Sequence, residues 1–318
     1  MHFSIEFSSL SFTEFTDLKE KFVFNALKLS PDSTTFGENV YTDVTPENMG
    51  CFLFEYHDDK VPVASFIILP GGEKVLYYST SIASEQTVQS LLRGNITKFC
   101  LHEQGHFCLH ASAMCIDDKV ILFVGQKGAG KSTLATYFHL KGHGVWCDDY
   151  AVLHHEDNCF LASQGETSLK INPDIVSALA IPETNIKRVF ELPSGWNKGV
   201  LGETITQKYY FTQGDNKTDD LPREVAAIFF INQRVAEPAE LITTQKKSEA
   251  LSVLMDEILL PGLNSKEYLK IYFQSVMTFL KTVPSYAIHS PDDITRIHEV
   301  YNSILETINI TLNETSIR

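Results

Sequence analysis

The stretch Ile121-Leu122-Phe123-Val124-Gly125-Gln126-Lys127-Gly128-Ala129-Gly130-Lys131-Ser132-Thr133 decides the fold. An apolar run ends at Val124, and a full Gly-x-x-x-x-Gly-Lys-Ser pattern, the Walker A motif, follows it directly. Glycines let the backbone curl so that successive amide groups point at one anion, and a following helix adds its positive end. The sequence therefore predicts a P-loop, a phosphate-binding loop between a strand and a helix.

Each residue of this loop has a predicted role in binding a nucleoside triphosphate, ATP, with Mg²⁺ as its cofactor. Lys131 can reach the β- and γ-phosphates as a point charge, and the hydroxyl of Ser132 can hold Mg²⁺. The preference for ATP over another phosphoryl donor stays open. The residues expected to contact the nucleotide are Gly125, Gln126, Lys127, Gly128, Ala129, Gly130, Lys131, Ser132 and Thr133.

The residues around the loop predict an α/β fold. Helical spacing follows from Ser132 to Leu140, and strands are expected over Cys108–Cys115, Val120–Val124 and Gly144–Cys147. A strand, tight loop, helix and strand in this order describe a βαβ unit. Asp148-Asp149 ends the last strand, where one carboxylate can bind magnesium while the other accepts a proton from an attacking hydroxyl.

The rest of the chain predicts a small α+β N-terminal domain over residues 1–94 and a catalytic domain over 95–318 with a helical C-terminal segment. The pattern indicates helices over 11–29, 84–92, 248–260, 265–281 and 292–310, and strands over 50–55, 61–69, 74–79 and 225–231. No nucleophile and base pair is visible in the N-terminal domain. Its predicted role is the choice of an acceptor.

The composition of the chain excludes some classes of binding partner. The chain has 318 residues, with 26 Lys+Arg against 40 Asp+Glu and a net charge of −14, which argues against nucleic acid and anionic membranes as partners. No apolar run approaches the roughly 20 residues of a spanning helix, and the first residues lack a basic segment followed by an apolar one. We expect a cytoplasmic protein. The oligomeric state stays open, with a homo-oligomer among the alternatives.

Several of these residues resemble the HPr kinase/phosphorylase family, whose fold is akin to that of phosphoenolpyruvate carboxykinase. The likeness covers residues 108–150 and rests on His110-Ala111-Ser112-Ala113, the strand and loop above, Gly142-His143 and Asp148-Asp149. A weaker similarity to the family is found in Ser168-Leu169-Lys170-Ile171-Asn172-Pro173 and Val283-Pro284-Ser285-Tyr286. By resemblance, Asp148 is the general base with His110 behind it, Lys131 is catalytic, and Asp149 joins Ser132 in holding the metal.

The resemblance implies a kinase, a phosphotransferase with an alcohol group as acceptor. The acceptor would be a Ser or Thr of a peptide or protein, or a small hydroxyl compound. The sequence departs from the family's Glu-Ile-Arg-Gly signature, and it offers Ser168-Leu169-Lys170 near that place. A divergent member of the group is therefore expected, with Glu166 and Lys170 as candidates for the missing carboxylate and cation.

Two other functions fit parts of the sequence. Asn216-Lys217-Thr218-Asp219 matches the pattern by which GTPases bind guanine, although the preceding residues are polar and no Asp-x-x-Gly follows the loop. A regulatory module that binds nucleotide without turnover is the second alternative. Arg223 and Lys187-Arg188 are either cations that approach the transferred phosphoryl group or ordinary surface residues.

Overall fold

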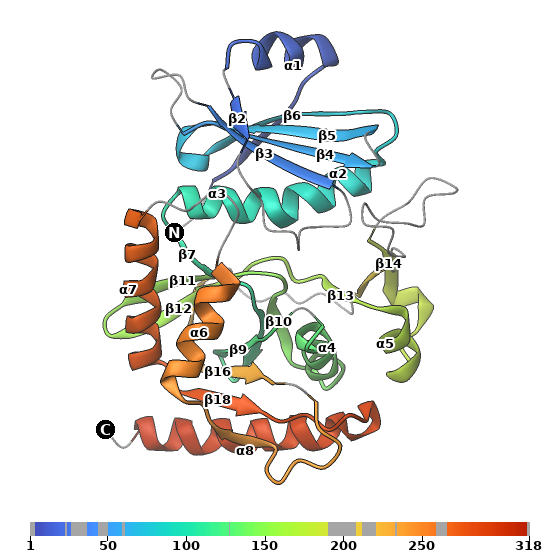
Figure 1. The fold of residues 1–318 in the computed structure, drawn as a ribbon. Helices are drawn as coiled ribbons and strands as arrows, with labels where there is room; N and C mark the ends of the chain where they lie inside the picture. Colours follow the sequence, from blue (N-terminus) through green and yellow to red (C-terminus); the bar gives the residue numbers. More distant parts are fainter. Residues whose placement is uncertain are drawn as a thin grey trace. The chain divides into compact units, whose positions relative to one another are not determined.

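The computed structural model describes residues 4–22, 24–26, 37–43, 50–58, 61–126, 128–189, 208–211, 221–232, 234–258 and 266–316. They form a mixed α/β structure of two compact units (Figure 1). The first unit holds the described residues as far as His106 together with Val189 and Lys266, and the second consists of Phe107–Arg188, Lys208–Ile258 and Glu267–Arg318. The division into domains at residues 1–94 and 95–318 stays a prediction. So does the role of the first domain in the choice of the acceptor.

The first unit is a six-stranded sheet with helices on both faces. Its strand order is β1-β6-β5-β4-β3-β2. Leu53 and Ile67 face helix α1 on one side, where they pack with Phe15, whereas Phe52 and Phe54 contact Phe99 of α3 on the other, with ring centroids 4.6 and 4.9 Å apart. The elements are β1 Glu6–Ser9, α1 Phe12–Lys19, β2 Phe24–Ala26, β3 Gly37–Asp43, β4 Phe52–Asp58, β5 Val61–Ile68, β6 Lys74–Ser79, α2 Glu85–Leu91, the turn Leu92–Ile96 and α3 Thr97–Glu103.

The helix predicted over residues 11–29 ends at Lys19, so the prediction is wrong over the described residues 20–22 and 24–26, while residues 27–29 lie outside the described residues. Ser11 and Glu14 form a capping box at its start, as helical spacing requires, but the chain leaves the helix at Glu20 and forms β2 from Phe24. Phe24–Ala26 pairs with β3 although Asn and Ala are depleted in strands, so tertiary pairing outweighs both local propensity and the helical spacing of the apolar positions. The other predicted elements are confirmed as β4, β5, β6 and α2. Strands β1 and β3 were not predicted.

The second unit has a nine-stranded sheet whose central strand is β16. The order is β10-β8-β9-β16-β12-β11-β7, with β18 also paired to β16 and β17 to β18. The predicted strand over Cys108–Cys115 is two strands, because β7 pairs with β11 while β8 pairs with β9 and β10. The strands are β7 Phe107–Leu109, β8 Ser112–Ile116, β9 Lys119–Val124, β10 Gly144–Cys147, β11 Ala151–Glu156, β12 Cys159–Ser163, β16 Arg223–Ile231, β17 Ile242–Thr244 and β18 Ser285–Ile288. A separate three-stranded sheet joins β13 Leu169–Ile171, β15 Tyr209–Phe211 and β14 Ile186–Arg188 in that order.

The strand directions bring distant segments to one edge of the sheet. β8 runs antiparallel to both β9 and β10, so β9 and β10 point the same way, and β16 and β18 run parallel to β9. The chain leaves β9, β10, β16 and β18 at this edge, which we call the carboxyl edge, and enters β8 there. Residues that follow these strands can therefore form one site.

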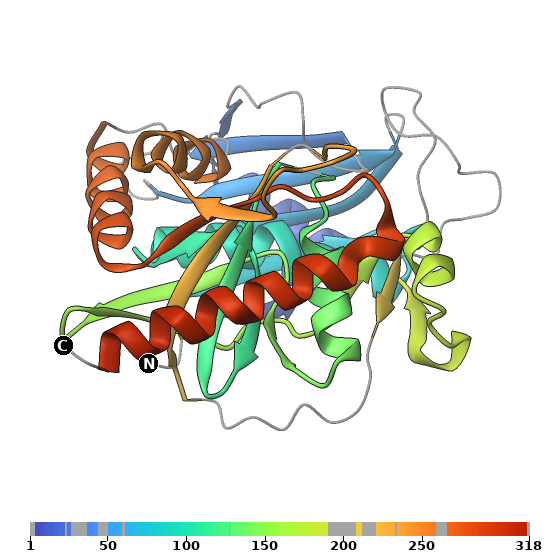
Figure 2. The same cartoon turned by 90° about the horizontal axis from the view of Figure 1, so that it is seen from below.

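Alternation along β9 divides the core between the two faces of this sheet. Val120, Leu122 and Val124 pack under α6 (Lys247–Ile258) and α7 (Lys266–Thr282), whereas Ile121 and Phe123 pack under α4 (Lys131–Leu140) and α8 (Ile297–Ser316). Figure 2 shows α8 running across the second face. The helices predicted after Ser132 and in the C-terminal segment are thus confirmed. Short helices lie at α5 Pro173–Ala178, Glu183–Asn185 and Ile294–Arg296. No helix among the described residues is long and apolar enough to cross a membrane.

Candidate functional site

The loop between β9 and α4, residues 125–130, is a tight turn that its glycines make possible; we call it the glycine loop. A Cβ on Gly125 would lie 2.8 Å from the carbonyl oxygen of Ile231, so the neighbouring strand leaves room for glycine only. Gly130 has φ +110° and stands at the N-terminus of α4, a left-handed conformation that favours glycine. Lys131 Nζ donates to the carbonyl oxygen of Gly125 at 2.6 Å, which places the ammonium over the loop. Lys127 lies outside the described residues.

A β-bulge turns the acid pair toward this loop. The register of β10 against β8 shifts between Val145 and Cys147, so Trp146 and Cys147 both face the α6–α7 side of the sheet. Strict alternation from Val145, which packs on the α4 side, would send Asp148 to the α6–α7 side. The extra residue reverses this, and Asp148 points at the first turn of α4 instead.

Asp148 is buried and held by three donors from separate segments. Ser112 Oγ, at the start of β8, donates to its Oδ1 at 2.6 Å. Ser132 Oγ, in the first turn of α4, donates to the same oxygen at 3.2 Å. The amide of Lys170, in β13, donates to Oδ2 at 2.9 Å. The carboxylate is therefore fixed directly beside the hydroxyl that follows Lys131.

Asp149 differs from Asp148 in backbone and in surroundings. Its φ is +70°, a left-handed conformation that Asp tolerates better than most residues and that is found often at functional sites. Its side chain is 40% exposed and forms an ion pair with Lys170 Nζ. One carboxylate of the pair is thus enclosed, and the other reaches solvent beside a cation.

The two aspartates have opposite pKa shifts. Burial raises the pKa of Asp148, the charge of Asp149 adds to the shift, and the hydrogen bonds from Ser112 and Lys170 only partly oppose it. Burial also acts to raise the pKa of Asp149, but the charge and hydrogen bond of Lys170 outweigh it and hold this pKa below its usual range. The same ion pair overcomes the burial of Lys170 and raises the pKa of its ammonium to about 12. Neighbouring carboxylates with separated pKa values are typical of acid–base sites.

Some of the residues that the family resemblance implies lie close to Asp148 and Asp149. His110 is among the charges that lower the pKa of Asp149, so it lies near the pair, and its expected place behind Asp148 stays a prediction. Lys170 forms an ion pair with Asp149, and its expected role as the missing cation stays a prediction. Glu166 acts through its main chain, since its carbonyl accepts from the amide of Asp148 at 2.8 Å. Its carboxylate accepts from the amide of Ser168 at 3.1 Å.

Of the other candidate cations, Arg223 lies at the opposite end of β9 from the glycine loop. It begins β16, beside the start of β9, whereas the glycine loop follows the end of β9. There its guanidinium pairs with Asp118 and lies 5.1 Å from the ring centroid of Trp146. Lys187 and Arg188 are exposed on β14, where Lys187 and Lys170 both lie opposite Tyr210 of β15. The guanine-binding pattern at 216–219 lies outside the described residues.

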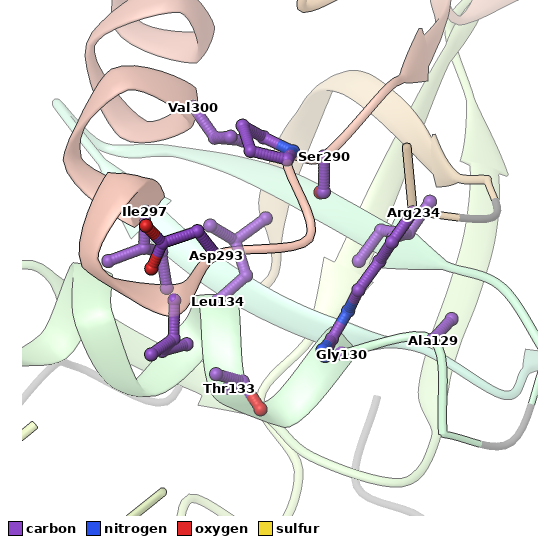
Figure 3. A pocket seen from close by; sticks show the side chains of 12 residues that line it. Ala129, Gly130, Thr133, Leu134, Arg234, Ser290, Asp293, Ile297 and Val300 are labelled. Atoms are coloured by element: carbon purple, nitrogen blue, oxygen red, sulfur yellow. The ribbon is translucent and has the colours of Figure 1, made fainter. Parts of the chain in front are cut away.

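Two residues of the site carried no predicted role. Ser112 lay within the family-like run, but nothing in the sequence showed that its hydroxyl reaches a carboxylate 36 residues away. Arg234 follows β16 at the carboxyl edge, and its Nη2 would lie 3.6 Å from a Cβ at Gly130. It lines two hollows beside the glycine loop, one of which Figure 3 shows. No local motif marks such a residue, because its position depends on the pairing of β16 with β9.

Comparison of the chain with known proteins finds only weak similarity. No family model matches the sequence, and neither does any curated protein. Among solved structures, the chain is similar to the HPr(Ser) kinase/phosphatase from Coxiella burnetii, with 15% sequence identity and a TM-score of 0.29 over 65% of this chain and 96% of that one. At this TM-score the likeness supports neither a shared fold nor an activity for this chain.

Proposed function

We propose that this chain is an ATP-dependent kinase that transfers the γ-phosphoryl group to a hydroxyl group, either of a Ser or Thr in a peptide or protein or of a small alcohol. One observation carries the proposal. Ser132, next to Lys131 in the phosphate-binding motif, lies 3.2 Å from the buried carboxylate of Asp148. Groups suited to bind phosphate and a group suited to accept a proton therefore meet at one point.

The glycine loop and Lys131 supply the binding of the triphosphate. Amides at the start of α4 can donate hydrogen bonds to an anion, and the positive end of the helix lies behind them. An ammonium has three donors, so the bond from Lys131 Nζ to Gly125 is compatible with contacts to phosphate oxygens. Fixed positive groups at the γ-phosphate stabilise the charge that spreads over its oxygens in the transition state.

The residues beside the loop fit Mg²⁺. The hydroxyl of Ser132 and the carboxylate of Asp149 are hard oxygen donors, and the lowered pKa of Asp149 keeps it ionised. The described residues include no group of three His, Cys, Asp or Glu that could enclose a metal, which suits an ion held partly by phosphate oxygens and water. When bound, Mg²⁺ would neutralise charge on the β- and γ-phosphates.

Asp148 is the proposed general base. Burial raises its pKa, which brings a carboxylate closer to the pH at which it exchanges protons most effectively. The acceptor oxygen attacks the γ-phosphorus, its proton passes to Asp148, and the bond to the bridging oxygen breaks to release ADP. His110 would orient the pair from the start of β8. Acceptor choice would lie in the first unit.

Incubation with Mg²⁺ and γ-labelled ATP tests the proposal. The protein is mixed with fractionated cell extract and with Ser- and Thr-containing peptides, and mass spectrometry identifies any species that gains a phosphoryl group. We expect transfer by the natural chain and by Lys141→Ala, a cation just beyond the other end of α4, and a much lower rate of transfer by Lys131→Ala. Loss of a catalytic donor of this kind costs about 10²–10³ in rate.

The same assay separates the alternatives. A regulatory module would bind ATP and yield neither ADP nor a phosphorylated product, and a hydrolase would yield ADP and phosphate alone. Either result, or full transfer by Lys131→Ala, would refute the proposed kinase.

A further inference from the structure

The small sheet of β13, β15 and β14 has one face in the core and one face outside it. Leu169 and Phe211 pack into the core beside α4. Because side chains alternate along a strand, the residues next to them point the opposite way. On that outer face the register places both Lys170 and Lys187 opposite Tyr210, so the three residues form one row across the sheet.

Lys208 adds a further cation to this row. It lies two residues before Tyr210, so alternation places it on the same face, and its charge is among those that lower the pKa of Asp149. Lys187 is exposed, and its ammonium forms no ion pair with another described residue. We call Lys170, Lys187, Lys208 and Tyr210 the basic row.

The basic row begins at the two aspartates of the candidate site. Lys170 Nζ forms the ion pair with Asp149, and the amide of Lys170 donates to Asp148 Oδ2 at 2.9 Å. The same ammonium lies 5.9 Å from the ring centroid of Tyr210, the next residue of the row. An acceptor whose hydroxyl reaches Asp148 therefore comes within reach of these cations.

The row carries more positive charge than its neighbouring carboxylate balances. Asp149 interacts with both Lys170 and Lys208, and Lys187 lies beyond them on β14. The chain as a whole has a net charge of −14, which repels acidic molecules. A local excess of cations attracts acidic groups to one place against that background.

The length of the row favours a peptide over a small anion. Neighbouring strands lie about 4.8 Å apart, so Lys187 is about 10 Å across the sheet from Lys170. An extended peptide covers this distance in about three residues, at about 3.3 Å each. Lysine ammonium groups on flexible stems suit carboxylates at variable positions, whereas the planar fork of arginine is suited to the fixed geometry of a phosphate.

We propose that the basic row binds acidic side chains of a peptide acceptor, so that the enzyme selects a Ser or Thr with Glu or Asp about two to four residues away. The acceptor hydroxyl lies at Asp148, and the neighbouring carboxylates lie at Lys187 and Lys208. The proposal rests on the proposed kinase function and names the class of acceptor, an acidic segment of a peptide or protein. The first unit stays the predicted site for parts of the acceptor outside this segment.

Peptides that cannot react test the row separately from catalysis. Two peptides carry Ala at the acceptor position and differ only in having Glu or Gln two to four residues away on both sides. Fluorescence anisotropy measures their Kd with the full chain at low salt, where exposed ion pairs are least screened. We expect the natural chain to bind the Glu peptide about tenfold more tightly than the Gln peptide, because several weak ion pairs add.

Lys187→Glu reverses the charge at the exposed end of the row, and Lys247→Glu is the matched control. Lys247 is exposed at the start of α6, on the other face of the nine-stranded sheet, and its substitution changes the net charge equally. Lys187→Glu should lose the preference for the Glu peptide and should bind a peptide with Lys at those positions about fivefold more tightly than the natural chain does. Such a gain also shows that the variant is folded. Lys247→Glu should keep the natural preference.

The outcomes separate the two proposals. Equal affinity of the natural chain for the Glu and Gln peptides, or the same loss in both variants, overturns the basic row and leaves the kinase standing. Transfer to a small alcohol and to no acidic peptide does the same. A preference for the Glu peptide that depends on Lys187, without transfer to the matching Ser peptide or to any other acceptor, supports the row and overturns the kinase.

Discussion

Ser112 is the residue whose removal tests the acid–base role of Asp148 most directly. Its hydroxyl is buried and donates to Asp148 Oδ1 at 2.6 Å, a contact that lowers the pKa of that carboxyl group. In Ser112→Ala the pKa rises further, so the acid limb of the pH–rate profile moves to higher pH. A hydrogen bond to a charged group is worth about 1.5–3 kcal/mol, so we expect kcat on the acid limb to fall about tenfold or more, with recovery at high pH.

The matched control is Ser163→Ala. Ser163 is also buried in the second unit, but its hydroxyl bonds His154 at 2.8 Å. The control should leave the acid limb in place. A uniform loss of rate at every pH in Ser112→Ala would show that Ser112 holds the fold and does not tune Asp148.

Asp148→Asn should separate activity from stability. Because the folded pKa is raised above the ordinary value of 3.8, the folded state binds more protons than the unfolded chain between the two values. The stability contribution of Asp148 therefore falls as pH rises from 3.8 through the folded pKa. Asn does not titrate, so the Tm of Asp148→Asn relative to the natural chain should increase from pH 4 to pH 8, as measured by calorimetry without nucleotide.

The same variant should lose turnover while it keeps nucleotide affinity. Removal of a general base costs about 10²–10⁴ in rate. We expect the Kd of Mg-ATP to stay within about twofold, because Lys131 and the glycine loop bind the phosphates without Asp148. A large rise in that Kd with little change in kcat would instead make Asp148 a metal ligand and Asp149 the base.

At the level of elements, we expect the buried face of helix α8 to contribute strongly to the free energy of unfolding. Ile304 is fully buried on the face of α8 that packs against the sheet. Ile304→Ala should lower the free energy of unfolding by about 2–5 kcal/mol, because a buried aliphatic side chain is replaced by a cavity. Ile271→Ala, at a position of α7 that is 58% exposed, should change it by less than about 0.5 kcal/mol. Urea unfolding measures both, and equal losses would show that α8 does not close the core.

The elements that the sequence predicted well are those with strong periodicity beside a motif. The apolar run before Gly125 predicted β9 correctly, and the helical spacing after the glycine loop predicted α4 correctly. The helix was predicted too long because the spacing of apolar residues carries no information about the pairing of β2 with β3. The break between β7 and β8 has the same cause, since the two strands have different partners.

The parts of the site that escaped prediction depend on contacts distant in sequence. The motif identified Lys131 and Ser132, and the doublet after β10 identified the aspartates. The side of the sheet on which Asp148 lies depends on a bulge at Trp146, which no residue type specifies. Arg234 and the pocket beside it form only where β16, α4 and α8 meet, so pattern along one segment could not reveal them.

At the scale of the whole molecule, the two units have separate cores, and every residue of the proposed nucleotide site belongs to the second. Ile67→Ala removes a fully buried side chain that packs with Phe15 and Leu53 in the first unit, at a cost of about 2–5 kcal/mol. Hydrogen exchange should show lost protection in β4–β6 and unchanged protection in β9 and α4, with the Kd of Mg-ATP unaltered.

Leu122→Ala is the reciprocal variant, since Leu122 is fully buried in β9. It should lower protection in β9 and α4 and weaken ATP binding, while β4–β6 keep their protection. If Ile67→Ala instead loosens β9 and weakens ATP binding to the same degree, the two units unfold as one. Acceptor choice could then not be assigned to the first unit by any variant of its core. If the units respond separately, Ile67→Ala should reduce transfer to a protein acceptor while ATP affinity is retained, because the first unit would then choose the acceptor.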